Sequence, residues 1–226
     1  MLSKEGCTAR QMRLIARLSK ANIDAAIISH PKEVYYFTGV IIPEEFPGPP
    51  VLLWLGADGV SLLIAHTDQG EPCVDECVTF APSVGSTVTP NLREVAGGLI
   101  VEALQARELK AGRLGWQGES LPQRLGMAVE QGIGGMPEWI AIDPVLADMQ
   151  EVKDLDEIEL LRKVVQVDLA AYAAAEEVIA PGVNELEGLA AAQKGAHLAA
   201  GEKVFHDGDY QCGEMGGFAR DRKIEA

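Results

Sequence analysis

The feature that most constrains this sequence is the long segment 152–192, "VKDLDEIELLRKVVQVDLAAYAAAEEVIAPGVNELEGLAAA". Asp154, with Glu157 three residues later, makes a capping-box signature for a helix start. Apolar residues then recur every three or four positions, as in an amphipathic helix, at Leu155, Ile158, Leu161, Val165, Leu169, Tyr172 and Ile179. Such a helix, running to Ala180, would be ~40 Å long at ~1.5 Å per residue.

A second helix is expected after a short break. Pro181 and Gly182 end the first periodic pattern, because proline cannot continue a helix and glycine favours its end. Asn184 with Glu187 repeats the capping signature, and an alanine-rich stretch follows to about Ala200. The sequence therefore predicts two consecutive helices that open a second structural part near Glu151.

The first 150 residues alternate between strand and helix patterns. Residues 8–23 carry apolar side chains near helical spacing, and a short buried-strand pattern follows at residues 25–29. Two apolar runs at residues 51–56 and 60–66 flank Asp58-Gly59, which is a strong hairpin signal. Helix patterns at residues 91–109 and 121–131 alternate with the strand patterns "GRLGWQ" and "EWIAID". We therefore expect an α/β domain with a mixed sheet and flanking helices.

Composition and charge exclude several classes of function. The chain has 34 acidic and 19 basic residues and a net charge of −15. A nucleic-acid-binding surface needs clustered basic residues, and the longest basic run here is "RDRK". No apolar run approaches the ~18 residues of a membrane span, and the N-terminus lacks the apolar core of a signal peptide. We expect no nucleic-acid or membrane partner.

The four cysteines indicate reduced thiols rather than a disulfide framework or a zinc site. They form no Cys-x-x-Cys pair, and the pair Cys73 and Cys77 has no second ligand pair at a supporting distance. Together with the missing signal peptide, this predicts a cytoplasmic protein.

In four places the sequence resembles the creatinase, prolidase and Xaa-Pro aminopeptidase family of pita-bread metallohydrolases. The first is "DAAIISHPKEVYYFTG", with its Tyr-Phe-Thr-Gly turn, and the second is the strand "GRLGWQG". The third and most specific is the linker helix after Val152, and the fourth is the turn "PGVNELE". The resemblance implies a creatinase-type N-terminal domain over residues 1–150. Residues 151–226 would then hold the linker helix and the incomplete start of an α+β pita-bread domain.

The family's activity implies chemistry that these residues do not supply. Its members use two divalent metal ions, held by two Asp, one His and two Glu, to activate a water molecule as nucleophile. Those ligands come after the segment that the chain matches. The resemblance therefore implies a truncated hydrolase, with no catalytic residue, no metal ligand and no cofactor in this chain as given, which we expect to be inactive. A full-length member would bind two divalent ions and a small peptide or small-molecule substrate.

Four residues are candidates for contact with substrate. In this family the N-terminal domain often reaches the active site of a neighbouring subunit, which makes Tyr36 and the loop around Phe46 candidates. Glu214 and Phe218 lie in the segment that leads toward the family's active site. The stretch "EMGGFARD", which contains both, lacks the histidine that family peptidases usually carry there. This absence leaves a non-peptidase hydrolase of another C–N bond as an alternative.

The last segments leave two further alternatives open. The stretch "FHDGDYQCGE" offers His206, Asp207, Asp209, Cys212 and Glu214 as possible ligands of a divalent metal, although a polar turn is the simpler interpretation. A non-catalytic binding or oligomerisation module is the other alternative. The apolar positions Leu161, Val165, Leu169 and Ile179 would expose a contiguous patch on a lone linker helix, and we expect the chain to self-associate as a homodimer.

Overall fold

The structure is a computed structural model of the 226-residue chain. It describes residues 1–42, 50–66, 70–80, 91–206 and 208. The chain divides into two compact units, Met1–Asp156 and Glu157–Ala226, and each is described by itself. None of the helices in the described residues is long and apolar enough to cross a membrane.

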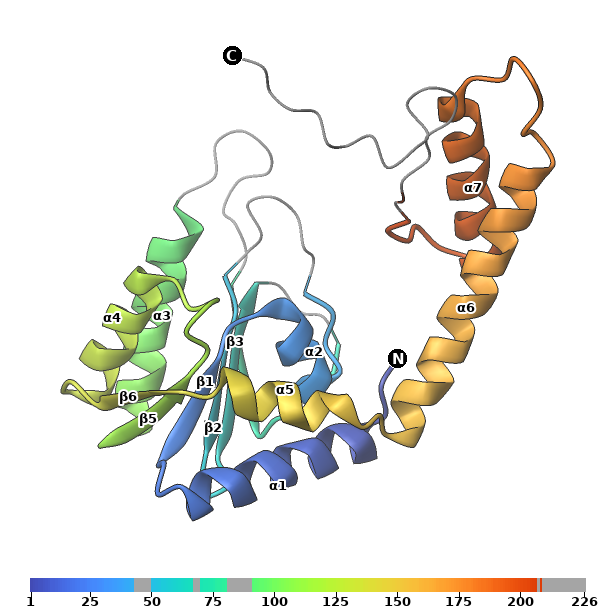
Figure 1. The fold of residues 1–226 in the computed structure, drawn as a ribbon. Helices are drawn as coiled ribbons and strands as arrows, with labels where there is room; N and C mark the ends of the chain where they lie inside the picture. Colours follow the sequence, from blue (N-terminus) through green and yellow to red (C-terminus); the bar gives the residue numbers. More distant parts are fainter. Residues whose placement is uncertain (43–49, 67–69, 81–90, 207, 209–226) are drawn as a thin grey trace, which may run out of the picture. The chain divides into compact units, whose positions relative to one another are not determined.

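Within these residues strands and helices alternate along the chain (Figure 1). The strands are β1 (Ala25–Ile28), β2 (Leu52–Gly56), β3 (Ser61–His66), β4 (Glu76–Phe80), β5 (Arg113–Trp116) and β6 (Glu138–Ala141). The helices are α1 (Lys4–Lys20), α2 (Pro31–Thr38), α3 (Leu92–Ala106), α4 (Gln123–Ile133), α5 (Asp143–Glu151), α6 (Leu155–Glu176) and α7 (Glu185–Ala200).

The six strands form one mixed sheet in the order β4-β3-β2-β1-β5-β6. The central pairs β1–β2 and β2–β3 are antiparallel, while β3–β4, β1–β5 and β5–β6 are parallel. The predicted hairpin joins β2 to β3, and Gly59 there has a φ of 95°, a backbone conformation that glycine adopts without strain. The predicted mixed α/β sheet with flanking helices is confirmed.

Helices cover both faces of this sheet, which explains the unbroken apolar character of its central strands. Successive residues of β1 point to opposite faces. Ala26 and Ile28 pack into a core with residues of α1, α2 and α5, whereas Ala25 and Ile27 pack into a core with residues of α3 and α4. Figure 1 shows these two helix layers on either side of the sheet.

Helix α1 begins earlier than the pattern from residue 8 indicates. Ser3 caps its N-terminus by accepting a hydrogen bond from the Gly6 amide, and the helix starts at Lys4. Its buried face comprises Cys7, Arg10, Gln11, Leu14 and Leu18. Two of these five are polar, and Arg10 is fully buried.

The predicted ends of one strand and one helix were wrong. The strand expected through Asp143 ends at Ala141, and the unpredicted helix α5 follows, with Pro144 in its first turn where its missing N–H costs nothing. Helix α6 ends at Glu176 rather than Ala180. Pro181 disfavours the α conformation at Ala180, and residues 177 and 178 already form a turn.

The second unit is built around the pair α6 and α7. Ala171 and Ala175 of α6 pack against Ala192 and Ala196 of α7. These small side chains allow the two helix backbones to lie close together. The predicted cap is confirmed, since Asn184 Oδ1 accepts a hydrogen bond from the Leu186 amide at 2.9 Å.

Candidate functional site

Of the four residues proposed to contact substrate, the structure describes Tyr36 only. Phe46, Glu214 and Phe218 lie outside the described residues. Tyr36 lies on α2, its side chain is 5% exposed, and its hydroxyl donates a hydrogen bond to the Met149 carbonyl at 3.2 Å. Its polar group is satisfied inside the first unit, so its contact with substrate stays a prediction.

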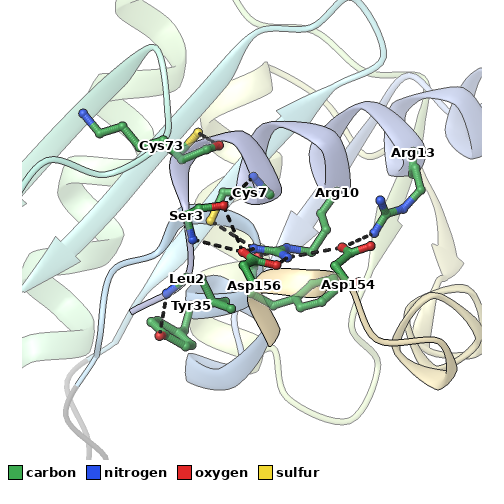
Figure 2. Close-up of polar contacts among 12 residues, drawn as sticks. Leu2, Ser3, Cys7, Arg10, Arg13, Tyr35, Cys73, Asp154 and Asp156 are labelled. Carbon is green, nitrogen blue, oxygen red and sulfur yellow. Dashed lines mark hydrogen bonds and ion pairs between the residues drawn. The ribbon is translucent and has the colours of Figure 1, made fainter. Parts of the chain in front are cut away.

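A cluster of polar contacts surrounds Arg10 in the first unit (Figure 2). The guanidinium binds Asp156 with two hydrogen bonds, from Nη1 to Oδ1 at 2.9 Å and from Nη2 to Oδ2 at 3.1 Å. This fork geometry is the strongest arrangement for an Arg–carboxylate pair. Arg10 also donates from Nε to the Tyr36 carbonyl at 2.7 Å, and its Cζ lies 4.8 Å from the centre of the Tyr36 ring. Arg10 thereby joins α1, α2 and the first turn of α6.

A second carboxylate extends the cluster toward solvent. Asp154 Oδ2 accepts hydrogen bonds from Arg10 Nη1 at 3.2 Å and from Arg13 Nη2 at 2.7 Å. On the other side, Ser3 donates its amide and its hydroxyl to Asp156 Oδ2 at 3.0 and 3.2 Å. The cluster therefore balances two cations with two carboxylates.

Gly6 makes room for this arrangement. A Cβ atom at this position would lie 2.2 Å from Oδ2 of Asp156, well inside van der Waals contact. Only a residue without a side chain lets the Asp156 carboxylate approach the first turn of α1 so closely. We call the group Ser3, Gly6, Arg10, Asp154 and Asp156 the α1–α6 anchor.

The electrostatics of the anchor favour its ionised form. Hydrogen bonds from Arg10 lower the pKa of Asp156 from 3.8 to about 2, against the opposing effect of burial. Burial by itself would lower the pKa of Arg10, but the hydrogen bonds to Asp156 and Cys7 raise it above its ordinary value. Burial raises the pKa of the Cys7 thiol, which therefore stays protonated and is a poor nucleophile.

The described residues do not fit a two-metal centre. No group of three His, Cys, Asp or Glu residues among them could hold a metal ion. Asp154 and Asp156, which Arg10 brings together, are already bound by its guanidinium, whose charge opposes a second cation. In the last segment, His206 Nδ1 lies 3.6 Å from Asp168, while Asp207, Asp209, Cys212 and Glu214 are outside the described residues.

The other histidines that the structure describes have structural contacts. His30 caps α2 by accepting from the Lys32 amide at 3.3 Å, and His197 accepts from the Val204 amide at 3.2 Å. His66 packs edge-on against Phe80. Gly134 ends α4 in the left-handed conformation, whereas Gly132 still lies within the helix.

Comparisons with known proteins agree with this architecture. A family model described as the creatinase/prolidase N-terminal domain matches residues 10–152, which include most of the first unit. A comparison with curated proteins finds no match. Arg10 is the first residue of the matched segment, whereas Asp154 and Asp156 lie just beyond its end.

Several solved structures share the fold. Prolidase from Pyrococcus furiosus is 21% identical with a TM-score of 0.61, covering 83% of this chain and 52% of that chain. X-Pro aminopeptidase from Thermotoga maritima is 19% identical with a TM-score of 0.58, covering 84% and 49%. Xaa-Pro dipeptidase from Bacillus anthracis is 18% identical with a TM-score of 0.61, covering 85% and 49%. The chain thus spans about half the length of the structures it matches.

Proposed function

We propose, from the premise that this chain belongs to the creatinase/prolidase N-terminal domain family, that it supplies the N-terminal domain of a metal-dependent hydrolase. The reaction would be cleavage of a peptide or related C–N bond, as in prolidases and Xaa-Pro aminopeptidases. The family match over residues 10–152, followed by α6, carries this proposal. At 21% identity or less the similar structures indicate the fold alone, so the activity is inferred.

Within such an enzyme this chain would act as a scaffold. The α1–α6 anchor ties the end of the first unit, at Asp156, to α1 and α2 through Arg10. The two divalent ions and their ligands would belong to residues outside those described. No catalytic step is assigned to the residues of the anchor, because each of their polar groups is engaged in the fold.

For the substrate, the proposal leaves two classes open. The named relatives point to peptides with a prolyl bond, whereas the lack of a histidine in "EMGGFARD" favours another C–N bond. A location in the cytoplasm also stays a prediction.

The test is to isolate the natural polypeptide and measure its intact mass, its metal content and its activity. We expect a mass well above 24.2 kDa, two divalent ions per polypeptide, and hydrolysis that a chelator abolishes. An Xaa-Pro dipeptide, an Xaa-Pro-Xaa tripeptide and creatine would separate the substrate classes. A natural mass of 24.2 kDa with no metal and no hydrolysis would contradict the proposal.

The second candidate is a self-association module, and a specific observation favours it. Leu161, Val165 and Leu169 on α6 are 49%, 51% and 55% exposed, so this helix presents a half-exposed apolar stripe. We expect the double variant Leu161→Gln/Leu169→Gln to lower self-association, measured by light scattering after size-exclusion chromatography. Met12→Gln is the control, because Met12 is 65% exposed on α1. A wild-type monomer at tens of micromolar would rule this candidate out.

A further inference from the structure

A small pocket lies between α4 and the strands β5 and β6 of the sheet (Figure 1). Its volume of about 280 Å³ is close to the lower end of the range of small-molecule sites, about 300 to 1,000 Å³. Its surface is mostly apolar, with contributions from Trp116, Trp139, Leu121, Pro122 and Met127. The pocket lies within the first unit and takes no part in the α1–α6 anchor.

The two tryptophans lie side by side because of the strand register. Strands β5 and β6 are parallel, with Leu114 opposite Trp139. Residues two apart in a strand point to the same face of the sheet, so Trp116 and Trp139 are diagonal neighbours on the face that α4 covers. Their ring centroids are 5.6 Å apart and their planes are inclined at 61°. The two half-buried rings therefore form a corner rather than a stack.

Helix α4 leaves room next to this corner. Gln123, Gly126 and Glu130 follow one another at steps of three and four residues, which places them on one face of the helix, and all three line the pocket. Gly126 is in the middle of this face and has no side chain. The space between the helix and the two rings therefore stays open at its centre.

Glu130 gives the pocket its charge. It is the one charged residue among the described residues that line the pocket. Its Oε1 accepts a hydrogen bond from Trp139 Nε1 at 2.9 Å, which fixes the carboxylate beside the ring. Within the described ranges no lysine, arginine or histidine forms an ion pair with it. A carboxylate beside apolar walls and without a cationic partner favours the binding of a cation.

The walls narrow the class of cation. Metal ions and primary ammonium groups hold their water strongly and would lose it against apolar walls. A guanidinium group binds a carboxylate best through both oxygens, and Oε1 of Glu130 is already bound to Trp139. A quaternary ammonium group has no N–H donors, and the face of a tryptophan ring attracts it more strongly than any other side chain does.

We propose that this pocket binds a quaternary ammonium group, with its methyl groups against Trp116 and Trp139 and its charge next to Glu130. This inference is independent of the proposed hydrolase function, because the site uses no metal ion and no residue of the α1–α6 anchor.

The test is a titration of the 226-residue chain with choline chloride, followed by tryptophan fluorescence. Trp116 and Trp139 line the pocket and should report binding, whereas Trp54 is fully buried in the core. We expect saturable binding in the millimolar range, and no saturable change with sodium chloride at the same ionic strength. The uncharged carbon isostere of choline, 3,3-dimethylbutan-1-ol, should bind about tenfold more weakly.

Three variants locate the site. Glu130→Gln removes the charge but keeps an oxygen for Trp139 Nε1, and should weaken choline binding about fivefold. Trp116→Leu removes one ring and should weaken it about tenfold, with Trp139 left as the reporter. Glu138→Gln is the matched control, because it removes a carboxylate that is 65% exposed and paired with Arg113 on the neighbouring strand. It should leave the affinity for choline unchanged.

Four results would each overturn the proposal. The first is the lack of saturable choline binding in the millimolar range, and the second is equal affinity for choline and its uncharged isostere. The third is equal affinity for choline and methylguanidinium, which would indicate a site for organic cations in general. The fourth is an unchanged affinity for choline in both Glu130→Gln and Trp116→Leu.

Discussion

Replacement of Asp156 by asparagine is the sharpest test of the α1–α6 anchor. Its carboxylate accepts the two hydrogen bonds of a fully buried Arg10, and its side chain is 14% exposed. An asparagine would turn one acceptor into an NH₂ group that faces N–H donors of Arg10 or Ser3. Arg10 would then be a buried cation that has lost one of its two carboxylate partners, with only Asp154 left.

Two estimates give the size of the effect. A shift of the Asp156 pKa from 3.8 to about 2 corresponds to a stabilisation of about 2 to 3 kcal/mol at neutral pH. Removal of one partner from a buried ion pair costs about 3 to 5 kcal/mol. We therefore expect Asp156→Asn to lower the free energy of unfolding of the first unit by about 2 to 4 kcal/mol at pH 7.

The pH dependence identifies the mechanism. Since the folded-state pKa of Asp156 lies below its unfolded value, its ionisation stabilises the fold above about pH 4. This stabilisation is lost as the pH falls toward 2. The same linkage relation predicts that the difference between wild type and Asp156→Asn narrows by about 1 kcal/mol between pH 7 and pH 3.

The assay is urea unfolding followed by tryptophan fluorescence. All three tryptophans of the chain, at positions 54, 116 and 139, lie in the first unit, so the signal reports the unit that contains the anchor. Asp148→Asn is the matched control, because Asp148 pairs with Arg17 on the surface of the same helix α1, with side chains 60% and 43% exposed. An exposed pair contributes at most about 1 kcal/mol. Equal losses in the two variants, or a pH-independent loss in Asp156→Asn, would refute the reasoning.

Four glycine variants, two in each unit, test close packing. Gly6→Ala would push a Cβ atom against Asp156 and should destabilise the first unit by about 1 to 3 kcal/mol in the same urea assay. Gly98→Ala, with open space at its Cβ position, should instead stabilise it by up to about 1 kcal/mol. Gly195→Ala would place a Cβ atom 2.8 Å from α6 backbone and should speed amide exchange in α7. Gly188→Ala, whose Cβ meets only an ordinary contact at 3.8 Å, should leave amide exchange in α7 unchanged. Equal exchange rates in Gly195→Ala and Gly188→Ala would contradict the close packing of α7 on α6 at Gly195.

Elements marked by strong local signals could be predicted from the sequence. The Asp58-Gly59 turn fixes the β2–β3 hairpin, and Asn184 fixes the start of α7, because in both cases the decisive contact lies within a few residues. Helix α5 lacked such a signal. It has nine residues, of which only Leu146 and Met149 are buried, and this is too short a stretch to establish a helical period after an apolar strand.

The buried polar face of α1 shows where a local interpretation fails. Arg10 and Gln11 stand at helical spacing from Leu14 and Leu18, which is a detectable sign that both are buried. Their partners are distant, however, since Asp156 is 146 residues from Arg10 and Gln11 donates to the Phe37 carbonyl. Burial of an arginine is favourable only when those partners are in place, so its role depends on the folded structure.

The carboxylates at the start of α6 favour the helix locally, and Asp156 also has a tertiary role as the partner of Arg10. Asp154, Asp156, Glu157 and Glu159 all favour a helix start through its positive end, and nothing local distinguishes Asp156 as the partner of Arg10. Gly6 likewise has a local effect and a tertiary effect on stability, of which the local one is unfavourable and the tertiary one favourable. Inside a helix it costs about 1 kcal/mol relative to alanine, yet its missing Cβ is what admits the Asp156 carboxylate at 2.2 Å from that position. The local cost of this glycine is smaller than the clash that an alanine would cause, and only the position of Asp156 in the fold decides between them.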